Sequence, residues 1–520
     1  MSQVSRLVIV GGGIAGWLTA AYMARTLCDK VNHNIRITLV ESPGSTPVGV
    51  GEGCWPSLRN TLAHLGISEN RFMQECQATF NQGTRFENWR HHSANTDNDA
   101  FYHLFDTPTL NWPVSPVPFW LSHLNDDPHP FADSVSIQQQ VCEAGLAPKQ
   151  LSTPEFQGHL NYGYHVDAGK FANLLSRVAS YEMGVSHIQA DLTHVHHNAA
   201  GDITHITTRQ AGDIAGDLFI DCTGFSSRLL AQSMNVPFVD YSHILLADRA
   251  IAMQVPYSSE NTEIPPYTRS VAQDAGWVWD IGLRDRRGIG YVYRSADCSD
   301  AQARDALMTY LGDEQLPGDI RVIPLRPGRR AKAWHHNCVA IGMSAGFIEP
   351  LESCALLMIE DACKQVADLF PAKHADMPHT AALYNDTFVR RWDNVVEFIK
   401  LHYVLSGRED TPFWLDNKRE STWPAGLKQK LLRWQSAPPA SCEFPDCQSL
   451  FTREHYEFIL FGMQSEKQLH AMAESYGKAS DLARMASAAL EERWGYTQAK
   501  LSSHRALLKA LEKDRFPRAR

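Results

Sequence analysis

The stretch RLVIVGGGIAGW, residues 6–17, decides the fold. Residues 6–10 form a continuous apolar run of strand length that stops at three glycines, and residues 14–27 have the apolar spacing of a helix. Residues 36–40 (RITLV) then form a second short apolar run. A strand, a glycine turn, a helix and a second strand in this order predict a βαβ unit on a parallel sheet. We therefore expect the α/β (α+β) fold class.

The glycines at the end of the first strand have the spacing Gly-x-Gly-x-x-Gly and open a helix. This arrangement permits a tight turn and lets a pyrophosphate approach the helix N-terminus closely. An acidic residue, Glu41, stands at the end of the second strand, where it can bind a ribose 2′-hydroxyl. The alternative is a glycine-rich turn without a ligand. The pattern predicts a dinucleotide site that includes Gly11, Gly13, Ile14, Ala15, Gly16 and Glu41.

Two later strands also end in glycines, which favours FAD over NAD. Residues 218–221 are followed by the rest of the DCTG motif, and residues 338–341 continue into Gly342 within AIGMSAGF (340–347). Backbone at such positions can approach a flavin. The chain has no second Gly-x-Gly-x-x-Gly motif for a nicotinamide, so the reductant is expected to come from outside.

The remaining chain divides by pattern into further regions. We expect residues 1–90 to be the first part of an FAD-binding region and residues 91–160, rich in Asn, Asp, Pro and aromatic residues, to be an irregular substrate-region insertion. Residues 161–370 are expected to complete the FAD-binding region, with a β-meander that begins near residue 190 and a β-sheet that carries the Trp-x-Trp sequence at 277–279. Residues 371–520 are expected to be mainly helical and to cover the substrate, ending in a long solvated amphipathic helix near 476–512.

Composition limits the partners and the compartment. The 520 residues include 48 Lys and Arg against 58 Asp and Glu, a formal charge of −10, so no nucleic-acid-binding face is expected. The 11 cysteines have no CxxC pair, which argues against a disulfide framework and a zinc ribbon. The chain also lacks a signal-peptide pattern and an apolar run of about 18 residues. We expect a cytoplasmic protein without a membrane partner, compatible with a homodimer.

Eight stretches, in the same order, resemble the flavin-dependent tryptophan halogenases and cover roughly the first 415 residues. They are GGGIAGW (11–17), GEGCWPSLRNTL (51–62), FNQGTRFENW (80–89), YHVDAGKF (164–171), FIDCTGF (219–225), GWVWDIGL (276–283), NCVAIGMSAGFIEPLES (337–353) and LHYVLSGREDTPFW (401–414). The resemblance implies an FAD-binding region like that of flavin monooxygenases and a largely helical substrate region. It implies an FADH2- and O2-dependent oxidoreductase, served by a separate flavin reductase, that uses chloride or bromide to halogenate an indole or another electron-rich aromatic.

The resemblance also implies roles for particular residues. Glu352 matches the family's essential carboxylate, which positions the oxidant or takes the ring proton, whereas by itself a Glu before a helix is more often a charge stabilised by the helix dipole. Trp277 and Trp279 match two indoles that keep the substrate away from the flavin, although such a pair on one strand face is otherwise a common core feature. The halide is assigned to the amides of Cys354 and Ala355, and the rest of FAD to Glu52, Gly53, Leu192, Met343 and Leu356.

Three departures from the family pattern lie at these positions. Asn81 replaces the family's catalytic lysine, and an amide carries or hydrogen-bonds an oxidised halogen far less well than an amine. Arg85 would share the face of Asn81 in an extended segment and could act as a donor. Gly282 replaces a proline of the Trp motif, which is expected to loosen the backbone, and Ser353-Cys354-Ala355 replaces Ser-Thr-Gly. The alternative is therefore a monooxygenase or oxidase of the same fold without halogenation, and a second is a flavin-binding protein without turnover.

Two further sequence patterns are better interpreted as structural features than as catalytic or metal sites. Gly342-x-Ser344-x-Gly346 matches the nucleophile elbow of α/β-hydrolases, but no HGGG-like oxyanion segment accompanies it. His194, His196 and His205 could approach one another on a hairpin, yet a solvated strand face is the better interpretation because metal-ligand spacing is absent. No metal site is predicted.

Overall fold

The computed structural model describes residues 3–30, 35–44, 50–91, 99–108, 115–124, 129–312, 320–444, 449–464, 466–473 and 481–518. The chain forms two compact units. The first comprises residues 1–78, 166–241 and 326–392, and the second comprises residues 79–165, 242–325 and 393–520. These boundaries differ from the sequence-based division at 90, 160 and 370. The assignment of FAD binding and substrate covering to the regions of that division stays a prediction.

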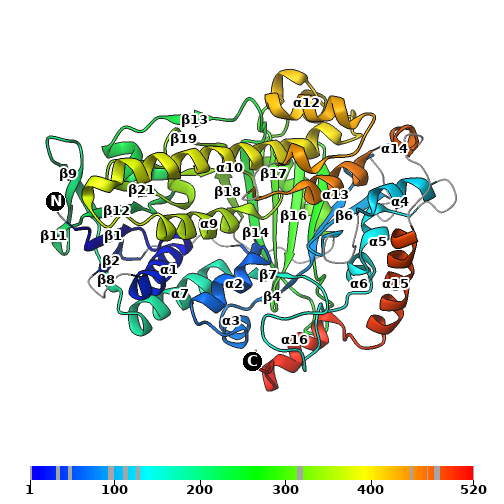
Figure 1. Ribbon diagram of the computed structural model, residues 1–520, viewed down its shortest axis with the longest axis horizontal. Helices are drawn as coiled ribbons and strands as arrows, with labels where there is room; N and C mark the ends of the chain where they lie inside the picture. The colour runs from blue at the N-terminus through cyan, green and yellow to red at the C-terminus, as the bar shows by residue number, and fades with distance from the viewer. Residues whose placement is uncertain are drawn as a thin grey trace. The chain divides into compact units, whose positions relative to one another are not determined.

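The first unit is built on a sheet whose strand order is β20-β21-β12-β1-β2-β8 (Figure 1). Strand β1 pairs in parallel with β2 on one side and with β12 on the other. The predicted βαβ unit is therefore confirmed. The strands are β1 (Arg6–Val10), β2 (Arg36–Glu41), β8 (Ser186–Gln189), β12 (Leu218–Asp221), β20 (Trp334–His335) and β21 (Cys338–Ala340).

Helices cover this sheet because their apolar faces pack on it and on one another. Helix α1 contacts both α7 and α9, and α9 begins two residues after Glu352, so this Glu does stand before a helix. The helices of the unit are α1 (Ile14–Lys30), α2 (Ser57–His64), α3 (Glu69–Glu75), α7 (Ala168–Arg177), α9 (Cys354–Asp368) and the first part of α10 (Met377–Leu405). The unit also contains the short π-helices η3 (Val178–Glu182) and η5 (Arg228–Ser233), and the short 3₁₀-helices η4 (Gly224–Ser226), η6 (Gly342–Ser344) and η7 (His374–Asp376).

Smaller strands complete the first unit. The predicted β-meander is present as β9 (Leu192–His197), β10 (Ile203–Thr208) and β11 (Gly212–Ala215), with antiparallel pairing throughout. A second small sheet has the order β13-β19-β22, formed by β13 (Phe238–Asp240), β19 (Gly328–Arg330) and β22 (Gly346–Phe347). Strand β3 (Glu52–Cys54) leads into α2.

The second unit contains a seven-stranded sheet with the order β18-β14-β17-β16-β15-β5-β6. One face of this sheet packs on helix α8 (Asp300–Leu311), where Val278, Ile289 and Leu307 belong to the same buried cluster. The strands are β5 (Gly83–Glu87), β6 (Ala100–Leu104), β14 (Arg249–Pro256), β15 (Thr268–Gln273), β16 (Gly276–Gly282), β17 (Arg286–Tyr293) and β18 (Arg321–Pro324). Strands β4 (Thr79–Asn81) and β7 (Gly163–Val166) pair antiparallel outside this sheet.

The segment 91–160 is more regular than predicted. Its strand β6 pairs with β5, and the rings of Phe86 and Phe101 stack across the pair with centroids 4.9 Å apart. Three helices follow, α4 (Val117–His123), α5 (Phe131–Val135) and α6 (Gln138–Glu143). Trp120 and Phe131 of this segment pack on Phe461 of the later helix 453–463, with ring centroids 5.0 and 4.9 Å apart. Residues 92–98, 109–114 and 125–128 of this segment lie outside the described residues.

The C-terminal region is helical, as predicted, but its last helix is not continuous. Two helices, α15 (Asp481–Gln498) and α16 (His504–Lys513), replace the expected helix 476–512. The break has a clear cause, because the Ser503 hydroxyl caps α16 by accepting the N–H of Ala506. The other elements are α11 (Pro412–Asn417), α12 (Ala425–Trp434), α13 (Arg453–Met463), α14 (Glu466–Ala473), η8 (Glu420–Thr422) and η9 (Ser441–Glu443).

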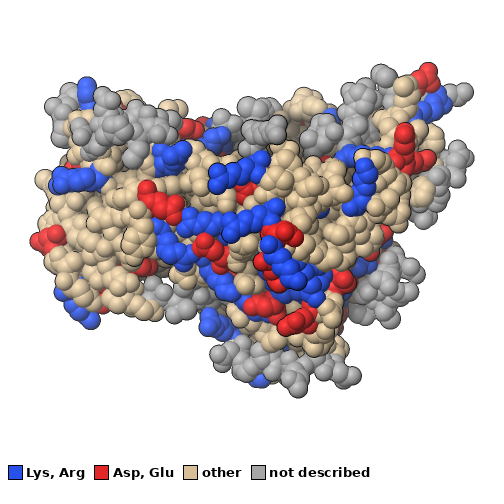
Figure 2. Space-filling view, turned by 90° about the horizontal axis from the view of Figure 1, so that it is seen from below, with Lys and Arg blue, Asp and Glu red and all other residues tan. Residues whose placement is uncertain are grey.

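One face of the molecule carries charges of both signs. On the face drawn in Figure 2, Lys and Arg side chains are interleaved with Asp and Glu side chains and do not form a patch of one sign. Within the described part of the chain, no helix is long and apolar enough to cross a membrane.

Candidate active site

A cavity of about 410 Å³ lies at the carboxyl ends of the parallel strands in the first unit. Ligands of open α/β sheets bind at this edge. Its lining includes Gly11, Gly13, Glu41, Leu192 and Met343, all predicted from the sequence. Loop residues after β12 that were not named among the site residues also line it, namely Thr223, Gly224, Ser226 and Arg228. Ile14, Ala15, Gly16, Glu52, Gly53 and Leu356 lie outside this lining.

The three glycines of the Gly-x-Gly-x-x-Gly motif are needed for different reasons. A Cβ on Gly11, whose φ is +117°, would lie 2.2 Å from the carbonyl oxygen of Cys222, and a Cβ on Gly16 would lie 1.8 Å from the carbonyl oxygen of Gly11. These two glycines are required by the protein's own packing. A Cβ on Gly13 would meet no protein atom within 4 Å, so the space over Gly13 is open. An open glycine at the start of α1 fits the close approach of a pyrophosphate.

Glu41 lies over the same loop. Its Oε1 accepts a hydrogen bond from His187 Nε2 at 2.7 Å, and its Oε2 lies 1.5 Å from the position that a Cβ on Gly12 would occupy. The carboxylate is thus held at the cavity by a neighbouring strand. This position fits a hydrogen-bond acceptor for a ribose hydroxyl, and the residues present fit the adenosine half of FAD.

The strand-end motif after β12 is held by a buried acid. Asp221 accepts hydrogen bonds from the backbone N–H groups of Thr223, Leu229 and Leu230 at 2.9 to 3.0 Å. Because all of these donors follow the strand, Asp221 fixes the loop that lines the cavity. Gly342, with φ of +73°, follows the other predicted strand, and a Cβ there would lie 2.8 Å from Cβ of Ala15. Both predicted glycine motifs therefore lie close to the first helix.

The N-terminus of α9 carries the predicted carboxylate and halide residues. Glu352 is buried, Ser353 is the N-cap, and its side chain makes no capping hydrogen bond. The first turn has no acidic residue, and Ala355 is exposed. The thiol of Cys354 is buried, and this burial, together with the negative charge of Glu352, raises its pKa to about 12. A neutral thiol beside open helix amides leaves those amides as the groups available to an anion.

Glu52, on β3, is an acid of the first unit with a raised pKa. Loss of solvent raises the pKa of its carboxyl to about 7. A protonated Glu52 can donate a hydrogen bond at neutral pH, whereas an ordinary carboxylate only accepts. This property is compatible with the predicted contact to a flavin.

The second unit carries the two indoles. Trp277 and Trp279 project from the same face of β16, with ring centroids 6.3 Å apart. Trp277 is fully buried, and its Nε1 has no hydrogen-bond partner among the described residues. The predicted same-face arrangement is confirmed, while the role of the pair stays a prediction.

Asn81 is buried at the end of β4. Its Oδ1 accepts the N–H of Gly83 at 3.2 Å. Gly83 has a φ of +143°, and a Cβ there would lie 2.3 Å from the carbonyl oxygen of His103. The chain therefore bends sharply two residues after Asn81, and the Asn81 amide supports that bend.

Comparisons with known proteins agree with this geometry. The sequence profile of the tryptophan halogenase family matches residues 6–477. The chain belongs to the tryptophan halogenase family. A curated relative, tryptophan 6-halogenase SttH of Streptomyces toxytricini, is 36% identical over 486 residues, which cover 88% of this chain and 89% of the relative.

Solved structures of flavin-dependent halogenases are also similar. The crystal structure of a tryptophan halogenase from Shewanella frigidimarina superposes with a TM-score of 0.93 at 38% identity, covering 100% of this chain and 99% of the other. BrvH, a flavin-dependent halogenase from Brevundimonas, gives a TM-score of 0.83 at 31% identity over 98% of this chain and 99% of its own. The halogenase fold thus extends through the last hundred residues, which carried no recognisable family motif.

Two expectations about the departures from the halogenase pattern are wrong. Asn81 lies on β4 and Arg85 on β5, in different sheets, so the shared-face argument for Arg85 does not hold. The nearest acid on the strand of Arg85 is Glu87, whose Oε1 lies 3.5 Å from Arg85 NH1 and whose carboxylate also binds Arg269. Arg85 therefore belongs to a buried ion-pair network on the sheet.

The second correction concerns Gly282, at the family's proline position. A Cβ on Gly282 would lie 2.6 Å from Cγ2 of Ile264 and 3.0 Å from the hydroxyl of Tyr257. Its carbonyl oxygen accepts a hydrogen bond from Thr79 Oγ1 at 2.6 Å. Tight packing and this bond hold the residue in place, so the glycine does not loosen the end of the Trp strand. It joins that strand to β4, the strand of Asn81.

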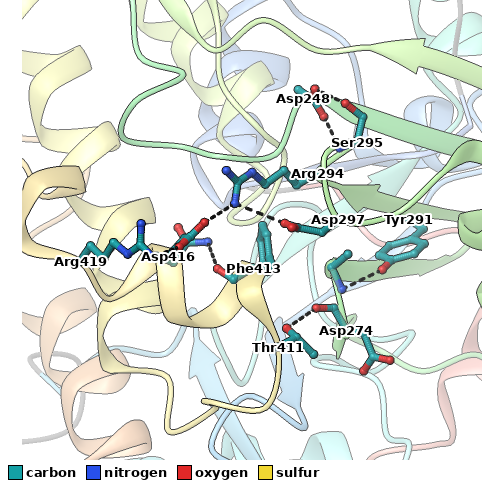
Figure 3. Close-up of polar contacts among 12 residues, drawn as sticks. Asp248, Asp274, Tyr291, Arg294, Ser295, Asp297, Thr411, Phe413, Asp416 and Arg419 are labelled. Carbon is teal, nitrogen blue, oxygen red and sulfur yellow. Dashed lines mark hydrogen bonds and ion pairs between the residues drawn. The ribbon is translucent and has the colours of Figure 1, made fainter.

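The last family-like motif, residues 401–414, leads into α11, which is fastened to the start of the Trp strand (Figure 3). Thr411 Oγ1 donates to the carbonyl oxygen of Asp274 at 2.6 Å, and Arg294 NH1 donates to Asp416 Oδ2 at 2.6 Å. The N–H of Ala275 donates to the hydroxyl of Tyr291 at 3.2 Å. These contacts fix the turn that directly precedes β16.

The hydrolase and histidine patterns have structural explanations. The buried hydroxyl of Ser344 donates to the carbonyl oxygens of Asp221 and Ile341, so it is occupied as a structural donor and does not stand as an exposed nucleophile. His196 and His205 stack on the β9–β10 hairpin with centroids 4.2 Å apart, and His194 is exposed on the same hairpin. Among the residues that the structure describes, no cluster of three or more His, Cys, Asp or Glu could hold a metal ion.

Proposed function

We propose that this protein is an FAD-dependent halogenase that uses chloride or bromide and O2 to halogenate an indole or another electron-rich aromatic. The observation that supports this most directly is the N-terminus of α9, where a buried Glu352 precedes an uncapped helix turn without acidic residues. When bound, reduced FAD together with O2 would supply the two-electron oxidation of the halide. The separate flavin reductase, the homodimer and the cytoplasmic location stay predictions.

The chain's own residues would divide the remaining work. The loop of Gly11, Gly13 and Gly16 with Glu41 would hold the adenosine half of FAD, and the amides of Cys354 and Ala355 would hold the halide at the positive end of the helix. In the substitution itself a carbon–halogen bond forms and a carbon–hydrogen bond breaks. We assign the released proton to the carboxylate of Glu352.

Trp277, Trp279 and Asn81 are assigned to the substrate side. Two indoles on one strand face present a broad apolar surface, which fits separation of an aromatic substrate from the flavin. Asn81 would replace the family's lysine as a neutral hydrogen-bond donor through Nδ2, since its Oδ1 is already used by Gly83. We expect a slower halogenase than one with an amine at this position.

The test is a product assay with the purified protein, reduced FAD, O2 and an indole panel, with bromide, chloride or neither. We expect halogenated product only when both halide and reduced flavin are present. Glu352→Gln should lower product formation about a hundredfold while FAD still binds. Glu69→Gln, which alters a buried carboxyl on α3 of the same unit, is the matched control and should retain activity.

The alternatives give different results in the same assay. Hydroxylated product, or O2 consumption that does not depend on halide, would favour a monooxygenase or oxidase. Bound FAD without any substrate-dependent turnover would favour a flavin-binding protein. Either result would contradict the proposed function.

A further inference from the structure

The indole of Trp55 lies against the backbone of the predicted catalytic carboxylate. Trp55 follows β3 and is buried, and its Nε1 donates a hydrogen bond to the main-chain carbonyl oxygen of Glu352 at 2.8 Å. Both residues belong to the first unit. The bond therefore joins the segment that carries Glu52 to the residue before the N-cap of α9.

This bond holds one side of an unusual peptide group. The carbonyl of Glu352 and the N–H of Ser353 belong to the same peptide, and that N–H donates to the carbonyl oxygen of Pro350 at 3.1 Å. Both polar groups of the peptide are thus fixed. Such double fixation is needed because Ser353 has a φ of +52° and a ψ of +31°, a left-handed conformation that residues with a Cβ adopt only at an energetic cost.

The conformation of Ser353 determines what the helix end exposes. In the usual N-cap conformation, which is extended, a serine side chain accepts an N–H of the first turn and removes it from use. Ser353 is left-handed and makes no such bond. The N–H groups at the start of α9 therefore remain available to a bound anion. The backbone of Glu352 is held in a single orientation.

A second tie keeps the two segments together independently of Trp55. The buried carboxyl group of Glu360, on α9, accepts hydrogen bonds from Thr61 Oγ1 at 2.5 Å and Ser57 Oγ at 3.0 Å, both on α2. Loss of the indole N–H alone should therefore leave α2 docked on α9. The effect of removing it should be local to the peptide 352–353.

We propose that Trp55 is a positioning residue, whose indole N–H fixes the Glu352–Ser353 peptide and thereby holds the Glu352 carboxylate and the open amides of α9 in their working orientation. This inference rests on the proposed function for the role of Glu352. It does not require Trp55 to touch the substrate, the flavin or the halide.

The test compares Trp55→Phe with a matched variant, Trp334→Phe. Trp334 is also buried in the first unit, and its Nε1 donates to the carbonyl oxygen of His336 at 3.0 Å, so both substitutions remove one indole–carbonyl bond. We expect W55F to lower kcat for bromination about tenfold, because loss of one buried hydrogen bond in the reacting arrangement changes a rate by about this factor. W334F should match the wild type, and FAD affinity should be unchanged in both.

A rescue separates positioning from simple packing. Glycine adopts a positive φ without a steric penalty, so W55F/S353G should recover most of the lost kcat if Trp55 acts by holding Ser353. A W55F defect that S353G does not relieve, or W55F activity equal to that of W334F, would overturn the inference. If W55F is insoluble, recovery of soluble, active protein in W55F/S353G supports the inference, and an insoluble double variant overturns it.

Failure of the proposed function would be visible separately. A wild-type protein that halogenates no aromatic in the panel refutes the halogenase assignment, and hydrogen exchange of the FAD-bound protein then decides the role of Trp55. We expect faster amide exchange in the peptide covering 350–357 for W55F than for W334F. Equal exchange in the two variants would overturn the inference whatever the activity.

Discussion

The Nε2 atom of His504 accepts a hydrogen bond from the main-chain N–H of Phe80 at 3.0 Å. The opposite ring nitrogen, Nδ1, donates to the carbonyl oxygen of Ile264 at 3.0 Å, so this pattern requires the neutral tautomer with a proton on Nδ1. Burial agrees with it by lowering the pKa of His504 to about 3. The first residue of helix α16 thus holds the strand that ends in Asn81.

The first prediction is that His504→Ala destabilises the second unit by about 3 kcal/mol, since it leaves a buried N–H and a carbonyl without partners and creates a cavity. Urea unfolding followed by tryptophan fluorescence measures the change. His379→Ala, at an exposed position on α10, is the control and should change stability by less than about 0.5 kcal/mol. Equal unfolding midpoints for the two variants would show that α16 does not hold β4.

The second prediction concerns the missing amine. We expect Asn81→Lys to raise indole bromination about tenfold or more, because an ammonium donates a charge-assisted hydrogen bond or carries halogen where an amide does neither well. The variant loses the Asn81–Gly83 hydrogen bond, so a small loss of stability should accompany the gain. Asn81→Met is the control for size, because Met is similar in length to Lys but carries no charge. A rise in bromination that Met reproduces would mean that side-chain length, and not the amine, limits the reaction.

The features that were predicted depend on residues close together in the sequence, whereas the features that were missed depend on contacts between residues far apart in the sequence. The βαβ unit, the glycine loop with Glu41 and the Trp277–Trp279 pair follow from local periodicity and spacing, and the structure places them as expected. The role of Gly282 depends on Ile264 and Tyr257, which are near it only in the folded chain. The separation of Asn81 from Arg85 likewise depends on the approach of Gly83 to the backbone of β6. His504 lies 424 residues from Phe80, and no local pattern in the sequence marks such a contact.

The third prediction uses the open space over Gly13. Because a Cβ there meets no protein atom within 4 Å, Gly13→Ala should leave the melting temperature of the FAD-free protein unchanged. It should weaken FAD binding at least about tenfold, roughly 1.4 kcal/mol, if the pyrophosphate approaches this position. Titration of the FAD-free protein with FAD, followed by flavin fluorescence, measures the affinity.

Gly495→Ala provides the comparison for that measurement, since Gly495 lies on α15 and also has open space around its Cβ position. It should bind FAD as the wild type does. Unchanged FAD affinity in G13A would place the pyrophosphate away from the glycine loop and contradict the assignment of this cavity.

The last prediction concerns Glu360, the acid that ties α2 to α9. Burial raises the pKa of its carboxyl to about 7 from an ordinary value of 4.5, although the hydroxyls of Thr61 and Ser57 lower it in part. Nearby titratable groups are the thiols of Cys54 and Cys363 and the phenol of Tyr22, and Glu360 contributes to the raised pKa of each of them. The folded protein therefore holds a proton on Glu360 that the unfolded chain releases above about pH 4.5.

The sign of the effect follows from this difference in bound protons. Between about pH 4.5 and 7 the folded state binds more protons than the unfolded state, so the free energy of unfolding falls as pH rises, by up to about 3 kcal/mol in total from this group. Glu360→Gln keeps an acceptor for the hydroxyl donors and removes the titration. Urea unfolding at several pH values should thus show a smaller loss of stability from pH 5 to pH 8 in E360Q than in the wild type. Parallel pH profiles for the two proteins would mean that Glu360 ionises normally and binds Thr61 and Ser57 as a carboxylate at all of these pH values.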